Sequence, residues 1–334
     1  MKLKIAVAGL GRIGKIHFEN LLQLNNVNLI SVMDPNQEAL NYAKEKGIEN
    51  LHTNFNELVS QKELEAVVIC TPTNTHADYI QIASKAGKQI FCEKPLDLKL
   101  ERVKEIIEVV EQTKTKLMIG FNRRFDDEFK KLKTSIKSGN IGTPHIIKIT
   151  SRDPSPPSID YIKNSGGLFL DMTIHDFDMA RFLVDKEIDE VYARGEALND
   201  IEISKAGDID TAVITMKYVD STIAIIDNSR KAVYGYDQRI EVFGTQGMIQ
   251  VDNLKVDNNT LFDKSGIKSS LPLNFFLERY QNAYKSEINN FVNSVIKNKP
   301  ISVSAYDGMK SLQIALAAKK SLKENRPVKI SEIN

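Results

Sequence analysis

The stretch GLGRIG at residues 9–14 decides the fold of the first part of the chain. It follows an apolar, strand-like run, opens an expected helix and lies about 20 residues before Asp34, which is the setting of a dinucleotide-binding G-x-G-x-x-G loop. Gly9 permits a tight turn, Gly11 lets backbone amides approach a pyrophosphate, and Gly14 allows close packing of helix on strand. The alternative is an ordinary glycine-rich turn, which this setting disfavours.

Asp34 ends the second expected strand and completes this cofactor site. Its carboxylate would accept hydrogen bonds from the adenosine ribose and repel the 2′-phosphate of NADP, and residues 35–37 supply no cation to offset that repulsion. The sequence therefore favours NAD over NADP. An Asp before a proline also begins turns, which is compatible with the cofactor role. The residues that this reasoning assigns to the cofactor are Gly9, Gly11, Arg12, Ile13, Gly14 and Asp34.

Strand-like and helical segments alternate through residues 1–119, with short links between them. Such alternation predicts βαβ units and a doubly wound parallel sheet, the α/β Rossmann arrangement. Residues 66–70 are nearly all apolar, as expected of a parallel strand buried on both faces. The expected strands are 5–8, 29–33, 52–53, 66–70, 89–91 and 117–120, and the expected helices are 15–24, 36–45, 55–60, 76–85 and 100–112.

Residues 120–334 have a different texture and predict a second, α+β domain with one large, mostly antiparallel open sheet. Short turns such as residues 219–221 and 244–247 separate consecutive strands at hairpin spacing. The last expected helix, 305–324, is a candidate to pack back on the first domain. The expected strands are 145–151, 191–197, 211–218, 222–228, 239–243 and 248–251, and the expected helices are 129–137, 168–184, 275–297 and 305–324.

The composition of the 334-residue chain narrows the function classes. Lys and Arg number 45 against 44 Asp and Glu, and neither half carries a basic surplus, so nothing indicates a nucleic acid or an anionic membrane as partner. No apolar run approaches the roughly 18 residues of a membrane-spanning helix. Cys70 and Cys92 each end a short apolar run, which favours buried thiols in a reducing cytoplasm. No metal-ligand spacing is present, so we expect no metal.

Two segments carry candidate chemistry outside the glycine loop. Glu93-Lys94-Pro95 follows a strand end, which places Lys94 at the edge of the sheet where ligands bind, although an isolated lysine is equally often solvated surface. On one helix, Asp171, His175 and Asp178 would form a polar stripe with apolar flanks. That stripe is either the wall of a ligand site or a satisfied core pair of Asp171 with His175.

Together these motifs resemble the Gfo/Idh/MocA family of NAD(P)-dependent sugar and polyol oxidoreductases, and within it the inositol dehydrogenases. The resemblance covers the whole chain and is carried by residues 9–14, 71–76, 93–95, 120–126 and 166–178. It implies NAD-dependent oxidation of a cyclic polyol, myo-inositol or scyllo-inositol, to the 2-keto inosose. It also implies a homo-oligomer, a tetramer or a dimer, that uses the far face of the second sheet.

The resemblance also implies a role for individual residues. Lys94, Asp171 and His175 would be the catalytic set, with His175 as the base, and the Lys94–Pro95 peptide is a candidate cis bond. Where some inositol dehydrogenases have a His followed two residues later by Asn, this chain has residues 152–154, Arg-Asp-Pro. The implied cofactor contacts are Thr71, Asn74, His76 and Glu93, and the candidate substrate contacts are Arg124, Arg152, Asp153, Asp178, Tyr236 and, more weakly, Tyr234.

Chemistry agrees with these roles. A histidine with an ordinary pKa of about 6.5 suits proton removal near neutral pH, an aspartate would fix its tautomer, and a lysine ammonium would favour alkoxide character. Two alternatives remain. One is a family member acting on another sugar or keto-sugar, and the other is a regulator that binds NAD without turnover.

Overall fold

The computed structural model describes residues 2–333, which group into two compact units. Of these residues, the first unit comprises 2–125 and 282–310, and the second comprises 126–281 and 311–333. The sequence predicted one division, between residues 119 and 120. The structure instead places a C-terminal segment, including the start of the helix at 305–324, in the first unit.

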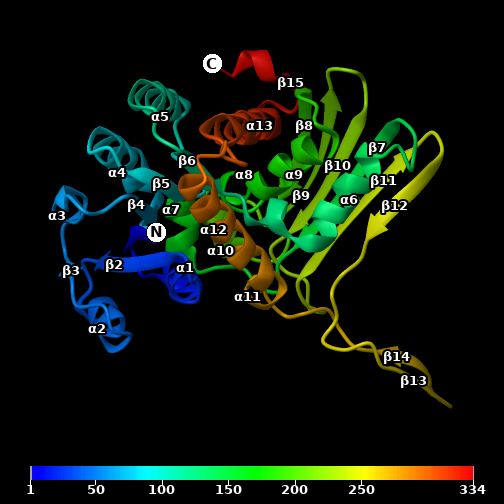
Figure 1. The fold of residues 1–334 in the computed structure, drawn as a ribbon. Coiled ribbons are helices and arrows are strands. Elements are labelled where there is room, and N and C mark those ends of the chain that lie inside the picture. Colours follow the sequence, from blue (N-terminus) through cyan, green and yellow to red (C-terminus); the bar gives the residue numbers. More distant parts are fainter. Residues whose placement is uncertain (1, 334) are drawn as a thin grey trace. The chain divides into compact units, whose positions relative to one another are not determined.

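The first unit is a six-stranded, all-parallel sheet in the strand order β3-β2-β1-β4-β5-β6 (Figure 1). The parallel sheet confirms the Rossmann prediction. Its central strands are buried on both faces; all four residues of β4 are buried. Its elements are β1 (Leu3–Ala8), α1 (Arg12–Leu22), β2 (Val27–Met33), α2 (Gln37–Glu45), β3 (Leu51–His52), α3 (Phe55–Ser60), β4 (Ala66–Ile69), α4 (Thr73–Lys85), β5 (Gln89–Glu93), α5 (Leu100–Thr113), β6 (Leu117–Gly120), η1 (Asn122–Phe125) and α12 (Gln281–Ile296).

Local chemistry explains where several of these helices begin. The side chains of Asn36 and Asn54 accept hydrogen bonds from the backbone two residues on, which caps α2 and α3. Phe291 of α12 packs edge-on against Phe91 of β5, with ring centroids 5.9 Å apart. A segment near the end of the chain therefore contributes to the core of the first unit.

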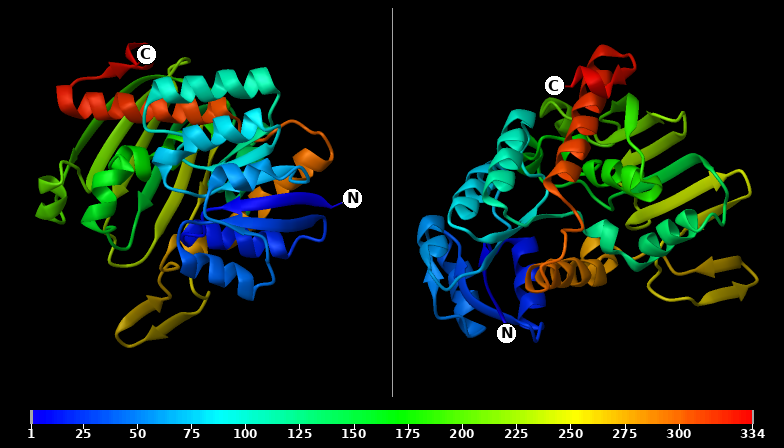
Figure 2. Two further views of the ribbon diagram at one scale, coloured as in Figure 1. Left: turned by 90° about the vertical axis from the view of Figure 1, so that its left-hand side faces the viewer. Right: turned by 45° about the horizontal axis from the view of Figure 1, so that its top comes forward.

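The second unit is built on a seven-stranded sheet in the order β12-β11-β7-β10-β9-β8-β15 (Figure 2). All its pairs are antiparallel except β10 with β7, so the prediction of a mostly antiparallel sheet is confirmed. Its elements are α6 (Asp127–Lys137), β7 (Pro144–Arg152), α7 (Ile159–Ser165), α8 (Leu168–Asp171), α9 (Ile174–Val184), β8 (Ile188–Glu196), α10 (Ile201–Lys205), β9 (Thr211–Tyr218), β10 (Ile223–Ser229), β11 (Asp237–Gly244), β12 (Gly247–Val251), β13 (Thr260–Asp263), β14 (Gly266–Ser269), α11 (Phe276–Arg279), β15 (Val328–Lys329) and η2 (Ile330–Glu332). Helix α13 (Ala305–Glu324) contains the boundary between the two units.

Two helices that the sequence predicted as continuous are each divided. The helix expected at 168–184 is interrupted at Met172 and Thr173, where the Thr173 hydroxyl donates to the side chain of Asn228 on β10 at 2.5 Å. The backbone N–H groups of Met172 and Thr173 both donate to Leu168 O, which widens the turn. The helix expected at 275–297 is likewise divided, at Tyr280.

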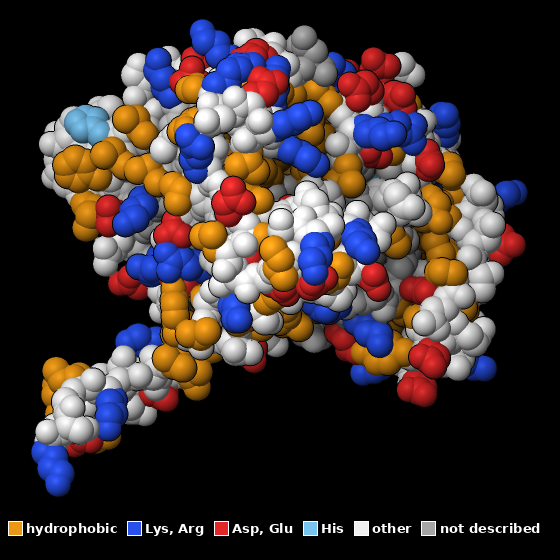
Figure 3. All heavy atoms as spheres, turned by 180° about the vertical axis from the view of Figure 1, so that it is seen from behind, with side chains coloured by type: hydrophobic (Ala, Val, Ile, Leu, Met, Phe, Trp, Pro, Cys, Tyr) orange, Lys and Arg blue, Asp and Glu red, His pale blue; other side chains and the backbone are white. Residues whose placement is uncertain are grey.

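The hairpin of β13 and β14 was not predicted. It extends away from the seven-stranded sheet of its own unit (Figures 2 and 3) and carries exposed apolar side chains, among them Phe262 and Ile267. Among residues 2–333, no helix is long and apolar enough to cross a membrane.

Candidate active site

The loop between β1 and α1 requires glycine at two of the three glycine positions of its G-x-G-x-x-G motif. Gly9 has a φ of +89°, and a Cβ there would lie 2.7 Å from the carbonyl oxygen of Cys70. A Cβ on Gly14 would lie 1.9 Å from the carbonyl oxygen of Gly9. A Cβ on Gly11 would meet no described atom within 4 Å, so the space over the start of α1 is open. The loop therefore fits a pyrophosphate held by the N-terminal amides of α1, which begins with Arg12.

Asp34 follows β2 and is bound to the same loop. Its carboxylate accepts the backbone N–H of Leu10 at 2.7 Å and that of Asn36 at 2.8 Å, and the residue is 9% exposed. The carboxylate thus both fixes the glycine loop and begins the turn into α2. Each oxygen keeps a lone pair with which it could accept a ribose hydroxyl.

His76 joins the two loops that follow β4 and β5. Its Nδ1 lies 2.8 Å from the carbonyl oxygen of Pro95, and its Nε2 lies 2.8 Å from that of Thr71. The ring is buried, and burial lowers the pKa of His76 even though both carbonyls favour its protonated form. Asn74, in the first turn of α4, is exposed. His76 therefore ties the backbone of the Glu-Lys-Pro segment to the start of α4.

The Glu-Lys-Pro segment lies at the end of β5, and its Lys94–Pro95 peptide is cis, as predicted. Glu93 Oε1 contacts Nε2 of His17 at 2.8 Å, and Glu93 Oε2 accepts the backbone N–H of Lys94 at 3.3 Å. A Cβ on Gly120, which pairs with Glu93 across β5 and β6, would lie only 2.9 Å from the carboxylate carbon. The Glu93 carboxylate is thus held between His17, Lys94 and the bare backbone of Gly120.

In the second unit, the structure corrects the predicted polar stripe. Asp171 ends α8, whereas His175 and Asp178 lie on α9, because the widened turn at Thr173 separates the two helices. His175 is half-buried in the first turn of α9. Asp178 is 1% exposed, and its Oδ1 accepts the hydroxyl of Ser311 at 3.4 Å.

Asp171 is held by two side chains of its own unit. Its Oδ1 accepts the hydroxyl of Tyr161 at 2.8 Å, and its Oδ2 accepts Nη1 of Arg230 at 3.3 Å. Arg230 is 1% exposed and also lies 3.8 Å from Asp208, whose carboxylate accepts the backbone N–H of Leu168. Asp171 is therefore positioned as an anion at the end of α8 by a buried cation.

The remaining candidate substrate residues are placed as follows. Arg152 donates to Asp227 and to the hydroxyl of Tyr234, and these hydrogen bonds, with that to Asp227 dominant, raise the pKa of Arg152. Asp153, half-buried, is joined through its backbone to Ser229 and Ala232.

Tyr236 and Arg124 lie in different units. Tyr236 is 5% exposed and packs edge-to-face on Tyr280 with centroids 5.9 Å apart. Arg124 belongs to the first unit, where it donates to Asp307 at 3.0 Å.

Three residues of these networks were missed from the sequence: His17, Arg230 and Glu287, whose Oε1 lies 3.8 Å from Nε2 of His17. Each is buried and charged or polar, but each meets its partners through long-range contacts. Of the three, His17 alone lies near a sequence motif that could have pointed to it, because it follows Gly14 by three residues on the first helix.

Comparison with known proteins identifies the family of both parts of the chain. Residues 3–121 match the "Oxidoreductase family, NAD-binding Rossmann fold", and residues 129–250 match the "GFO/IDH/MocA C-terminal domain". The chain is 48% identical to a myo-inositol 2-dehydrogenase of Thermotoga maritima over 332 residues, covering 99% of both proteins. It is 43% identical to an inositol 2-dehydrogenase of Rhizobium meliloti, covering 99% of this chain and 100% of the relative.

Solved structures agree. The scyllo-inositol dehydrogenase of Lactobacillus casei, determined with bound NAD(H) and scyllo-inositol, has a TM-score of 0.93 to this chain at 34% identity, covering 99% of this chain and 100% of that one. With this likeness over its full length, and with both of its parts matched, the chain belongs to the Gfo/Idh/MocA family of oxidoreductases.

Proposed function

We propose that this chain is an NAD-dependent inositol 2-dehydrogenase, which oxidises myo-inositol or scyllo-inositol to the 2-keto inosose. The observation that carries the proposal is its 48% and 43% identity, over nearly the whole chain, to two inositol 2-dehydrogenases. The open space at Gly11 and the carboxylate of Asp34 support NAD as the cofactor. When bound, NAD accepts the hydride that leaves the carbinol carbon.

The catalytic residues are Lys94, Asp171 and His175. His175 acts as the base that takes the hydroxyl proton, because a histidine exchanges a proton near neutral pH. Asp171, held as an anion by Arg230, stabilises the imidazolium that forms on His175. The ammonium of Lys94 favours alkoxide character on the reacting oxygen.

Substrate recognition requires several hydrogen-bonding groups, because a polyol presents a hydroxyl on every ring carbon. We assign this role to Arg124, Arg152, Asp153 and Asp178. The pairing of Arg152 with Asp227 and Tyr234 supports it by fixing the guanidinium in one orientation. Tyr236, packed on Tyr280, is the weakest member of the set.

We also propose that the chain works as a cytoplasmic homo-oligomer, with a tetramer as the expected state. Four exposed apolar side chains lie in one row across the second sheet, since Met248 pairs with Phe243, Phe243 with Ile146, and Ile146 with Ile223. Such a row supports burial against a second copy. Both cysteines are thiols, which supports a reducing compartment. Light scattering of wild type and Phe243→Lys tests the assembly; an unchanged mass would contradict this interface.

The activity is tested with purified protein, NAD and a panel of inositols and pyranoses. We expect NADH formation with myo-inositol or scyllo-inositol. Turnover of another sugar alone would sink the substrate assignment, and binding of NAD with no turnover on any polyol would favour a regulator. His175→Ala and Lys94→Ala should lower kcat by about 10²–10⁴-fold while NAD affinity stays near that of the wild type. The exposed Lys99→Ala is the control for the second variant.

Gly11→Ala tests the cofactor site separately. A Cβ at this position meets no described atom, so the variant should melt like wild type. Its affinity for NAD should nevertheless fall, because the added methyl group occupies the space through which the pyrophosphate approaches the amides. Unchanged NAD affinity in Gly11→Ala would show that the pyrophosphate lies elsewhere.

A further inference from the structure

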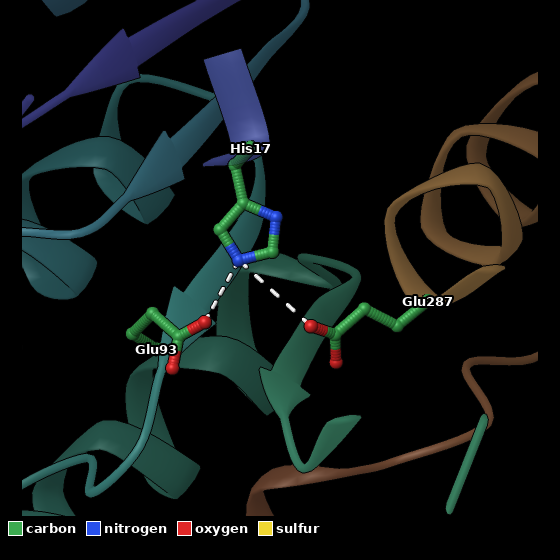
Figure 4. A group of neighbouring side chains, drawn as sticks. All are labelled: His17, Glu93 and Glu287. Carbon is green, nitrogen blue, oxygen red and sulfur yellow. Dashed lines mark hydrogen bonds and ion pairs between the residues drawn. The ribbon is translucent and has the colours of Figure 1, made fainter. Parts of the chain in front are cut away.

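Three ionisable side chains meet inside the first unit beneath the Glu-Lys-Pro segment (Figure 4). His17 comes from α1, Glu93 from the end of β5 and Glu287 from α12. Nε2 of His17 lies 2.8 Å from Glu93 Oε1 and 3.8 Å from Glu287 Oε1. One ring nitrogen therefore faces two carboxyl groups.

The cluster is closed off from solvent. The side chains of His17 and Glu287 are 0% exposed and that of Glu93 is 12% exposed. The imidazole packs edge-on against Phe91 and Tyr284, at centroid distances of 4.8 and 5.8 Å. Within residues 2–333, Glu287 forms no ion pair with a lysine or arginine, and neither of its oxygens has a hydrogen-bond partner.

Hydrogen bonding indicates which ring nitrogen of His17 carries a proton. Nδ1 is buried and has no hydrogen-bond partner among the described residues, so a proton there would leave a donor unsatisfied at a cost of about 1–3 kcal/mol. Nε2 has Glu93 Oε1 as its acceptor at 2.8 Å. Nε2 therefore carries a proton and donates it to Glu93, whereas Glu287, at 3.8 Å, receives no hydrogen bond from this ring.

Among the described residues, the other titratable groups near Glu287, which are Glu93, Cys70 and Cys92, carry no positive charge. Burial, and next to it the negative charge of Glu93, raises the pKa of Glu287 well above its ordinary value. The thiols of Cys70 and Cys92 are kept neutral in the same way, because burial raises both pKa values. A proton is therefore the cheapest way to hold Glu287 in this interior.

A metal ion fits the cluster less well than a proton. Zinc holds nitrogen and oxygen ligands at about 2.0–2.2 Å, which separates two ligands by about 3.3 Å in tetrahedral geometry. The contact between His17 and Glu93 is 2.8 Å, the length of a direct hydrogen bond.

The cluster reaches Lys94 through Glu93. While Oε1 of Glu93 faces His17, Oε2 accepts the backbone N–H of Lys94. Gly120 leaves no room on the other side, because a Cβ there would lie within 3.0 Å of both carboxylate oxygens. The orientation of the Glu93 carboxylate therefore fixes the backbone from which the Lys94 side chain starts.

We propose that His17 and Glu287 are positioning residues for Lys94: Glu287 is a neutral carboxylic acid, and His17 orients the Glu93 carboxylate against the Lys94 backbone. The inference rests on the proposed function for the role of Lys94. The protonation state of Glu287 does not depend on it, so the two can fail separately.

Infrared spectroscopy tests the protonation state without using activity. The difference spectrum between wild type and Glu287→Gln at pH 6 should contain the C=O band of one protonated carboxyl group, which glutamates in solution largely lack at that pH. A difference confined to carboxylate bands would overturn the proposal. So would failure of Glu287→Gln to fold, since glutamine is the neutral isostere of the protonated acid. The metal content of the purified protein is measured as well. Stoichiometric zinc or another divalent metal, whose removal changes the infrared bands of the cluster, would show that an ion takes the place of the proton. That result would also overturn the proposal.

Kinetics with myo-inositol and NAD test the positioning role. Glu287→Ala should lower kcat, because it removes the carboxyl group beside His17, and Glu287→Gln, the neutral isostere, should restore most of that loss. Glu93→Gln should lower kcat by about 10²-fold, the usual loss when a reacting group is misplaced by about 1 Å. Glu65→Gln is the matched control, because Glu65 also accepts the backbone N–H of a lysine, Lys4, at 2.8 Å, but at the start of the sheet's strands.

Gly120→Ala provides a second route that leaves every charge in place. Its Cβ pushes the Glu93 carboxylate off Lys94, so kcat should fall about tenfold in the folded variant. If Glu93→Gln and Gly120→Ala both match the kcat of Glu65→Gln, the positioning role is refuted. If the wild type oxidises no inositol, the proposed function fails instead, while the infrared result still decides the state of Glu287.

Discussion

One buried carboxyl group in each unit is held in an opposite way. In the first unit, the carboxyl groups of Glu287 and Glu93 both face the ring of His17. In the second, Asp171 lies 3.3 Å from the guanidinium of Arg230, which is itself 1% exposed. One interior removes a negative charge with a proton, and the other balances it with a permanent cation.

The two carboxyl groups should therefore respond differently to mutation and to pH. A guanidinium remains charged at all accessible pH values, so removing it strands an anion in a dry interior. A carboxylic acid is neutral only while the pH is low enough, so its contribution to stability changes with pH.

Removing the cation of the second unit should be the most damaging change. Arg230→Met keeps much of the side-chain volume but leaves Asp171 and Asp208 without their buried partner. We expect the free energy of unfolding to fall by about 3–5 kcal/mol, measured by urea denaturation. Lys231→Met, the exposed neighbour, is the control and should change it by less than about 0.5 kcal/mol. Equal stability of the two variants would show that Arg230 does not compensate these carboxylates.

The features that could be predicted from the sequence are those whose residues lie close together in the chain. The glycine loop, Asp34 and the Glu-Lys-Pro segment could be predicted because their residues are consecutive or share one βαβ unit, and strand–helix alternation then gives the sheet. The networks that hold the candidate catalytic residues are not local. His17 meets Glu93 76 positions away, and Arg230 meets Asp171 59 positions away. Neither side chain stands in a pattern that would mark it as buried.

The prediction of two continuous helices was wrong for the same reason. The apolar periodicity of residues 168–184 continues through Thr173, so it predicts one helix. The interruption depends on Asn228, which lies 55 positions away on a strand. Its side-chain oxygen accepts a hydrogen bond from the Thr173 hydroxyl. That interruption is what separates Asp171 from His175 onto two helices, so the geometry of the candidate site could not be read from spacing alone.

The pH dependence of stability should reveal the proton of the first unit. The pKa of Glu287 in the folded state is raised above its ordinary 4.5, so its stabilising contribution is complete below pH 4.5 and is lost as the pH rises toward the folded-state pKa. Each pH unit in that window should remove about 1.4 kcal/mol, a loss that Glu287→Gln lacks. In thermal melts from pH 4 to 9, the melting temperature of Glu287→Gln should rise relative to that of wild type as the pH rises. Parallel curves would contradict a protonated Glu287.

An exposed ion pair gives the smallest effect, with the opposite sign. Asp220 pairs with Lys186, and chiefly this hydrogen bond lowers the pKa of Asp220 to about 2, although its side chain is 39% exposed. Because the folded-state pKa is lowered, the contribution is present above the ordinary value of 3.8 and is lost as the pH falls through about 2. Solvent screens such a pair, so Asp220→Asn should lower the free energy of unfolding by well under about 1 kcal/mol at pH 7, and by less still in 1 M salt. The variant keeps an oxygen that can accept the backbone N–H of Thr222, so the measured change isolates the charge. If Asp220→Asn instead cost as much as Arg230→Met, exposure would not distinguish a surface pair from the buried cation, and the contrast between the two kinds of compensation would lose its physical basis.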